Sequence, residues 1–231
     1  MNLSTQKKAK IYQNILKQKK NNTWKFYTNL KKNMREKSDL REEDIKLSNN
    51  IYDFLDKTFY ATEVTNFERV NDKKRQVGGI DTIFEIDGKK YIADEKAAVR
   101  WRNLTTYSLE LSFINKKGEV QDGWFIRDDL QNDSYVFVWV DEKEGKEYIS
   151  LVVVKKEKIL EHLKTLGWTK ESLRMKESLI RNGIPTYMGR KEIDGYKFSF
   201  SKQLVEKPIN IILPRSVYEN LSDKIWSCEL N

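Results

Sequence analysis

The feature of this sequence that most limits its fold is a change of hydrophobic period in residues 78–154. Apolar and polar side chains alternate there in short runs rich in β-branched and aromatic residues, a pattern typical of β-strands. The runs are IDTIFEI, KYIADEKAAV, TYSLELSFI, DGWFI, SYVFVWV and EYISLVVV. Turn signals separate them at Asp87-Gly88, Lys117-Gly118, Asp122-Gly123 and Glu144-Gly145. We therefore predict a mostly antiparallel sheet over this region.

Helical patterns flank these strands on both sides. Residues 1–45 are rich in lysine and lack glycine, and the segment LSNNIYDFLDKTF indicates a helix that begins at Ser48-Asn49. Two more helices are predicted from about residue 156 to Gly167 and from Thr169 to Gly183. The strands YKFSFS and INIIL and a short helix after Pro214 complete the chain.

These patterns predict an α+β fold with a helical N-terminal layer, organised as one domain over residues 1–231. Within it we expect a basic helical segment at 1–45, a core at 46–168, and a C-terminal helix and strand extension at 169–231.

The composition favours a polyanionic partner. Lys and Arg outnumber Asp and Glu by 43 to 35, which gives a formal net charge of +8. The single cysteine, Cys228, excludes an internal disulfide and fits a reducing cytoplasm. The chain begins without a secretory signal and holds no apolar run of the ~20 residues needed to span a bilayer. We expect a cytoplasmic protein that does not enter a membrane.

Several chemistries lack the residues they need. His162 is the only histidine, which disfavours histidine-based triads. The sequence contains neither GxxxxGK[ST] nor GxGxxG, so no nucleotide cofactor is expected.

The stretch GGIDTIFEIDGKKYIADEKAA, residues 78–98, holds the most informative group of charges. A two-residue turn at Asp87-Gly88 places Asp81 directly opposite Asp94, and Lys96 projects from the same face as Asp94. Opposed like charges weaken a sheet by up to ~1 kcal/mol, unless a hard cation such as Mg²⁺ lies between them. The simpler interpretation is a pair of solvated acids offset by a lysine. The apolar residues on both sides of the DEK triplet favour a functional site.

This arrangement resembles the PD-(D/E)xK nuclease superfamily, which has the restriction-endonuclease-like fold. The first acid is Asp81 in GGID, and the acid-any-lysine triplet is Asp94-Glu95-Lys96 in YIADEK. The resemblance covers residues 46–154. Ile80 stands where the motif has proline, and a strand-like segment follows where many members continue into a helix.

The resemblance implies a Mg²⁺-dependent endodeoxyribonuclease in which Mn²⁺ can substitute. Asp81 and Asp94 would bind the metal, and Lys96 would position the attacking water and stabilise charge on the phosphate. Glu110 is the candidate for a further catalytic acid, with Glu63 and Glu68 as alternatives. A type II restriction enzyme that cuts double-stranded DNA as a homodimer is the first choice, because two sites can then act on the two strands.

Basic residues flank the hairpin on both sides in sequence and form a candidate phosphate track. The candidates are Arg69, Lys73, Lys74, Arg75, Gln76, Arg100 and Arg102. Trp24, Phe26 and Trp101 lie among positive charges, as in platforms that stack unpaired bases, although core packing is the commoner role of tryptophan.

Three other functions stay open. A phage or repair nuclease that recognises DNA structure would use the same residues. A non-catalytic nucleic-acid-binding module would use the basic surface alone. In a protein-interaction domain, the charge would serve only solubility.

Overall fold

The computed structural model describes residues 46–184 and 195–230. The chain divides into two compact units, residues 1–49 and 50–231. The predicted basic N-terminal segment, with Trp24 and Phe26, lies outside the described residues. All elements described below belong to the second unit, in which the segments 50–168 and 169–230 contribute strands to the same two sheets.

A large sheet forms the centre of this unit, with the strand order β1-β2-β3-β6-β7-β10 in the described part of the chain. Its strands are β1 (Thr65–Arg69), β2 (Thr82–Ile86), β3 (Lys89–Arg102), β6 (Ser134–Lys143), β7 (Lys146–Lys155) and β10 (Lys224–Glu229). Strands β3 and β6 run parallel, whereas the other neighbours are antiparallel. The prediction of an α+β fold with a mostly antiparallel sheet is therefore confirmed.

The turn at Asp87-Gly88 joins β2 and β3 as predicted. Both turn residues have positive φ, 50° at Asp87 and 75° at Gly88, as a type I′ turn requires. The strands pair with Ile86 opposite Lys89 and Thr82 opposite Ala93. The predicted register is confirmed. The backbone twist of a type I′ turn matches the twist of the two strands, which explains why an Asp-Gly pair predicts a hairpin reliably.

A second, smaller sheet combines two strands that lie between β3 and β6 in the chain with two that follow α5 (Lys170–Arg181). Its order is β5-β4-β9-β8, formed by β4 (Thr106–Ile114), β5 (Val120–Asp122), β8 (Lys197–Phe200) and β9 (Ile209–Pro214). The sequence predicted TYSLELSFI as a strand but did not distinguish the two sheets. The predicted strand DGWFI is wrong: Gly123 to Ile126 form a turn that packs on β4 through two backbone hydrogen bonds, from Gly123 N–H to Leu111 O and from Phe125 N–H to Glu110 O.

The helices largely follow the predicted pattern. They are α2 (Phe59–Thr62), α3 (Lys73–Val77), α4 (Lys156–Thr165), α5 (Lys170–Arg181) and α6 (Arg215–Leu221). Thr169 caps α5, where its side-chain oxygen accepts a hydrogen bond from Ser172 N–H at 3.2 Å. The predicted start at Ser48-Asn49 is wrong, because residues 46–57 are already helical from residue 46.

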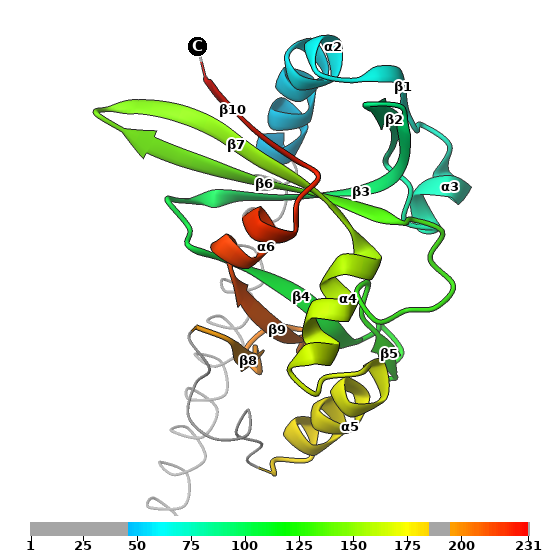
Figure 1. Cartoon of the computed structure of the whole chain (residues 1–231). Helices are drawn as coiled ribbons and strands as arrows, with labels where there is room; N and C mark the ends of the chain where they lie inside the picture. Colours follow the sequence, from blue (N-terminus) through cyan, green and yellow to red (C-terminus); the bar gives the residue numbers. More distant parts are fainter. Residues whose placement is uncertain (1–45, 185–194, 231) are drawn as a thin grey trace, which may run out of the picture. The chain divides into compact units, whose positions relative to one another are not determined.

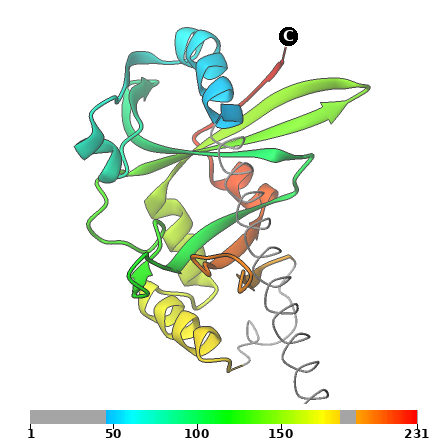
Figure 2. The ribbon, with the colours of Figure 1, turned by 180° about the vertical axis from the view of Figure 1, so that it is seen from behind.

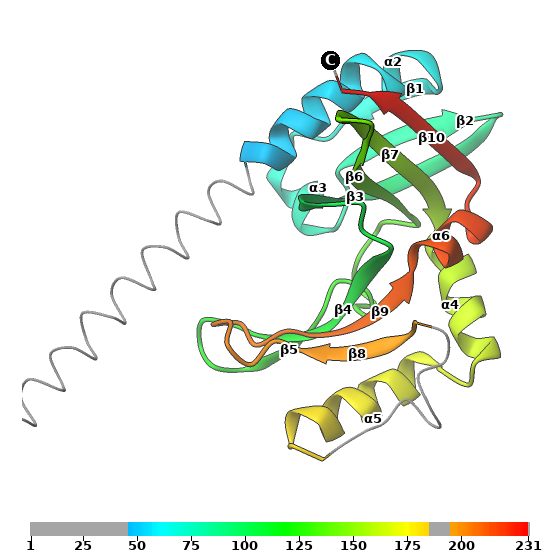
Figure 3. The same cartoon turned by 90° about the vertical axis from the view of Figure 1, so that its left-hand side faces the viewer.

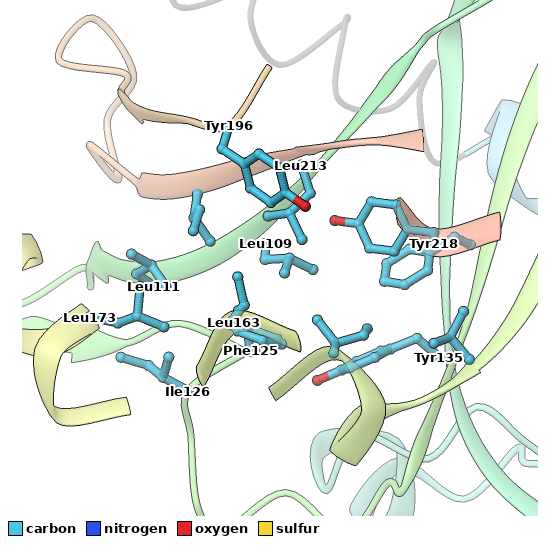
Figure 4. Close-up of a cluster of buried hydrophobic side chains, with 14 of the residues drawn as sticks. Leu109, Leu111, Phe125, Ile126, Tyr135, Leu163, Leu173, Tyr196, Leu213 and Tyr218 are labelled. Carbon is cyan, nitrogen blue, oxygen red and sulfur yellow. The ribbon is translucent and has the colours of Figure 1, made fainter. Parts of the chain in front are cut away.

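Two apolar clusters lie on opposite faces of the large sheet. Residues 50–57 and α2 cover one face (Figure 1), where Leu55 and Phe59 pack on Phe84 and Val136. The small sheet, α4, α5 and α6 cover the other face, as the views from behind and from the side also show (Figures 2 and 3). Side chains from β4, β6, β9 and these helices meet in that second cluster (Figure 4). The predicted site residues of β3, Asp94 and Lys96, lie on the face of the large sheet that the small sheet covers.

No helix among the described residues is long and apolar enough to cross a membrane.

Candidate active site

Asp81 and Asp94 meet at the open end of the β2–β3 hairpin. The backbone N–H of Asp81 donates to Ala93 O at 2.9 Å, one residue out of the register in which Thr82 faces Ala93. The Asp81 carboxylate accepts the backbone N–H of Glu95, also at 2.9 Å. Asp81 is therefore held against β3, and its carboxylate lies close enough to Asp94 to affect the pKa of that acid.

Asp94 is buried, with only 4% of its surface exposed. Lys96 lies on the same face of β3 and donates from Nζ to Asp94 Oδ1 at 2.5 Å. Burial raises the pKa of the Asp94 carboxyl to about 7, the lysine opposes this increase, and the charge of Asp81 adds to it. Desolvation is thus stronger than the ion pair. The site holds two acids whose mutual repulsion favours an added cation or proton.

Glu95 points to the opposite face of β3, as the alternation predicts. Its side chain is almost fully buried and accepts hydrogen bonds from Tyr60 Oη at 2.7 Å and Arg69 Nη1 at 2.6 Å. Arg69 also forms an ion pair with Asp56. The rings of Tyr52, Tyr60 and Phe67 surround the Arg69 guanidinium. This network fastens β3 to the helical layer behind it.

Glu110 approaches the same site from the small sheet. The pairing of β4 with β9 shifts by one residue between Glu110 and Ser112, a bulge of the kind that redirects side chains. Burial raises the pKa of the Glu110 carboxyl, while the backbone N–H of Trp124 and the charge of Lys96 lower it. The structure thus brings the predicted residues Asp81, Asp94, Lys96 and Glu110 into one neighbourhood.

Sequence reasoning missed Trp124. The Lys96 ammonium lies over the Trp124 ring, 5.0 Å from the ring centroid. Trp124 also packs edge-on against Tyr135, with ring centroids 5.2 Å apart. The Asp-Gly pair before Trp124 marked a turn, but no sequence pattern connects that turn to β3.

Two tyrosines border the acids, the half-buried Tyr52 and the buried Tyr135. Tyr52, from the helical residues 50–57, donates from its hydroxyl to Glu95 O at 3.4 Å. Burial and the charges of Glu95, Asp81 and Asp94 raise the pKa of Tyr52 well above its ordinary value. Tyr135 is the neighbour of Asp94 on β6. Its hydroxyl has no hydrogen-bond partner among the described residues.

Gly79 leads the chain into Asp81 in a conformation that few other residues adopt. Its φ is +79°, and a Cβ atom there would lie 3.1 Å from Asn132 Oδ1. The glycine therefore admits the close approach of the buried Asn132 side chain from the loop before β6.

The predicted basic track is divided by ion pairs. Arg69 forms the ion pairs described above, Arg75 pairs with Glu68, and Arg102 pairs with Glu147. The Gln76 side chain donates a hydrogen bond to Val70 O. Lys73 and Lys74 are exposed on α3 and form no ion pair with the described residues. Arg100 is exposed to solvent and also interacts with another part of the protein. Trp101, between Arg100 and Arg102, has 65% of its surface exposed, so it does not take the core role expected for tryptophan.

The alternative acids have other partners. Glu63 accepts from Lys224 Nζ at 2.6 Å, and Glu68 pairs with Arg75. In residues 46–184 and 195–230, no group of three or more His, Cys, Asp and Glu side chains is arranged to hold a metal ion. Asp81 and Asp94 form a pair of carboxylates, and Glu110 stands near Lys96.

His162 and Cys228 stand apart from these acids. His162 Nε2 lies 2.6 Å from the hydroxyl of Tyr196, and Cys228 is half-buried on β10. A pocket of about 650 Å³ is lined by Asp141, Tyr148 and Arg215 among others, and it contains none of the predicted site residues.

Comparisons with protein-family models, with curated proteins and with solved structures find no match to this chain.

Proposed function

We propose that this chain is a Mg²⁺-dependent endodeoxyribonuclease of the PD-(D/E)xK type, in which Mn²⁺ can substitute. The observation that carries the proposal is the buried Asp94, which lies beside Asp81 and is bound by Lys96 from the same face. Burying an acid beside a second acid is unfavourable for folding, so a functional requirement is the simplest reason for the arrangement.

The residues present fit a hard divalent cation. Mg²⁺ prefers carboxylate oxygens and keeps several water ligands, so two carboxylates suffice from the protein. Asp81 and Asp94 would hold the ion, and its charge would offset both the burial and the repulsion by Asp81 that raise the pKa of Asp94. When bound, Mg²⁺ would act as a Lewis acid on a phosphoryl oxygen and lower the pKa of a bound water.

The protein side chains have separate roles in this proposal. Lys96 would leave Asp94 for the phosphate, where its ammonium stabilises charge that develops during cleavage. Asp81 would keep its orientation through the Glu95 N–H. Glu110 would accept a proton or orient a water, because burial raises the pKa of its carboxyl.

The proposed substrate is double-stranded DNA, and the formal net charge of +8 supports a polyanion. Most simply, the protein would be a type II restriction enzyme that works as a homodimer, with one site for each strand. Lys73 and Lys74, exposed on the helix that leads into Gly78 and Asp81, would contact phosphates beside the site.

Digestion of plasmid and phage DNA with Mg²⁺, followed by mapping of the ends, tests the proposal. Discrete fragments with defined ends indicate a restriction enzyme. Cutting confined to branched or flapped DNA indicates a phage or repair nuclease instead.

Variants connect any cleavage to the site. Asp94→Asn and Lys96→Ala should each lose at least about 100-fold in rate. Glu85→Gln, an acid on the same hairpin that bonds Asn66, should cut normally. DNA that is bound but never cut would favour the non-catalytic binding module, and an Asp94→Asn variant that cuts at the normal rate would exclude this hairpin as the active site.

A further inference from the structure

The turn at Gly123 and Trp124 contacts two members of the candidate active site at once. The Trp124 ring lies under the Lys96 ammonium at 5.0 Å. Its backbone N–H stabilises the charged form of Glu110.

Gly123 makes this double contact possible. A Cβ atom at residue 123 would lie 2.4 Å from the backbone oxygen of Glu110 and 2.7 Å from its Cγ. Only glycine allows the turn to approach β4 so closely. The approach is fixed by hydrogen bonds from Gly123 N–H to Leu111 O and from Phe125 N–H to Glu110 O. The position of Trp124 is therefore set by the bulge that redirects Glu110.

The ring also limits where Lys96 can go. A lysine side chain has four rotatable bonds, and holding its ammonium in one place costs conformational entropy. An aromatic face attracts an ammonium most strongly when both are shielded from water. Lys96 is 25% exposed and Trp124 is half-buried, so this contact is partly shielded. Tyr135 packs edge-on against the same ring.

We propose that Trp124 is a positioning residue of this site: its ring holds Lys96 beside Asp94, and the turn that carries it packs on the backbone of Glu110. The proposal rests on the nuclease function proposed above for its effect on rate, whereas the contact itself can be tested without DNA. Trp124 makes no direct contact with the reacting atoms. It reduces the freedom of the groups that do.

The first test is spectroscopic and needs no activity. Lysines of the full chain are methylated reductively with ¹³C-formaldehyde, and the Lys96 signal is identified by its loss in Lys96→Arg. Methyl groups above an indole face are shifted upfield by the ring current. We expect an upfield Lys96 signal in the native chain, a smaller shift in Trp124→Phe, and none in Trp124→Leu. A Lys96 signal at the position of exposed lysines in the native chain overturns the proposal.

The second test measures cleavage by the same variants with Mg²⁺. A misplaced lysine reduces the stabilisation of the transition state more than the affinity for substrate. Trp124→Leu should therefore lower kcat about tenfold with little change in KM. Trp124→Phe should recover most of the rate. A Trp124→Leu chain that keeps the native kcat overturns the positioning role. If the native chain cuts no DNA, the proposed function fails, and the Lys96 signal alone decides the contact.

Trp226→Leu is the matched control. Trp226 is also half-buried and contacts an aromatic ring, Phe59, at 5.6 Å in the other cluster. This change should lower thermal stability but leave kcat and the Lys96 signal unchanged. A similar loss of kcat in both variants would mean that Trp124 acts only through stability, and it would overturn the proposal.

Discussion

At the scale of single residues, burial at the site disfavours the charged form of its acids. Asp94 is buried beside Asp81, and Lys96 offsets only part of the cost, so the pKa of Asp94 rises to about 7. Glu95, one residue away, is also buried, but Tyr60 and Arg69 satisfy its carboxylate. Neighbouring acids on opposite faces of one strand therefore differ: Glu95 anchors the strand, while the Asp94 carboxylate is only partly compensated by Lys96.

The raised pKa of Asp94 predicts that Asp94→Asn increases the stability of the fold by an amount that depends on pH. The folded chain holds a proton on Asp94 up to about pH 7, whereas the unfolded chain releases it near the ordinary value of 3.8. Stability therefore falls as pH rises through this window, because the folded state binds more protons. In EDTA, Asp94→Asn should unfold at a higher temperature than the native chain at pH 8, by roughly 2–4 °C for each kcal/mol gained. The difference should shrink toward pH 4. An equal difference at both pH values would contradict the assigned burial.

Arg69 gives a second prediction at this scale. Arg69→Ala leaves the Glu95 carboxylate buried with less compensation and should destabilise the fold by about 3–5 kcal/mol in urea unfolding. Arg75→Ala breaks an exposed pair with Glu68 and should cost less than about 1 kcal/mol. The sequence placed both arginines on the DNA track. If Arg69→Ala has little effect on stability but weakens DNA binding, then Arg69 contacts DNA as the sequence predicted.

At the scale of elements, local signals were predictable and contacts between distant elements were not. The Asp87-Gly88 turn determines the register of β2 and β3 as far as Thr82 and Ala93, so the nearness of Asp81 to Asp94 follows from a few adjacent residues. Thr169 and Gly167 likewise mark helix ends through local backbone chemistry. The segment DGWFI shows the limit. Its apolar residues suggested a strand, but Phe125 and Ile126 are buried by a turn folded against β4.

The part of the site that depends on the small sheet could not be predicted for the same reason. Glu110 was proposed from its apolar strand, yet its nearness to Lys96 requires a second sheet and a bulge. The ion pairs of Arg69 and Arg102 join residues 26 and 45 positions apart in the chain. Positive charge close to the motif in sequence therefore gave no information about where each side chain points.

Gly123→Ala tests how the elements are joined. The added methyl group would meet the backbone of Glu110 at 2.4 Å, so the turn must move away from β4. We expect a loss of about 1–3 kcal/mol of stability, as in other overpacked sites. Hydrogen exchange of the Phe125 amide should accelerate, because its bond to Glu110 O is displaced. Unchanged exchange at Phe125 would show that the turn absorbs the methyl group in place.

At the scale of the whole molecule, the formal net charge is +8. Near the site, ion pairs with acids offset part of the positive charge. Three predicted arginines are neutralised by Asp56, Glu95, Glu68 and Glu147. The exposed Lys73 and Lys74 stand on α3, and Asp81 follows within a few residues. If DNA reaches the acids, these two lysines are the cations best placed along the chain to meet its phosphates.

The dependence of DNA affinity on salt measures their contribution. Each phosphate neutralised by a cation adds about 0.9 to the slope of log affinity against log salt. Replacing Lys73 and Lys74 with alanine should reduce that slope by about 1–2 and weaken binding to all sequences alike. Lys116→Ala with Lys117→Ala is the matched control, since both lysines are exposed in the turn between β4 and β5 and carry the same charge. Equal reductions from both pairs would mean that DNA responds to net charge alone. A reduction confined to Lys73 and Lys74 would place the phosphates on α3, at the entrance to Asp81.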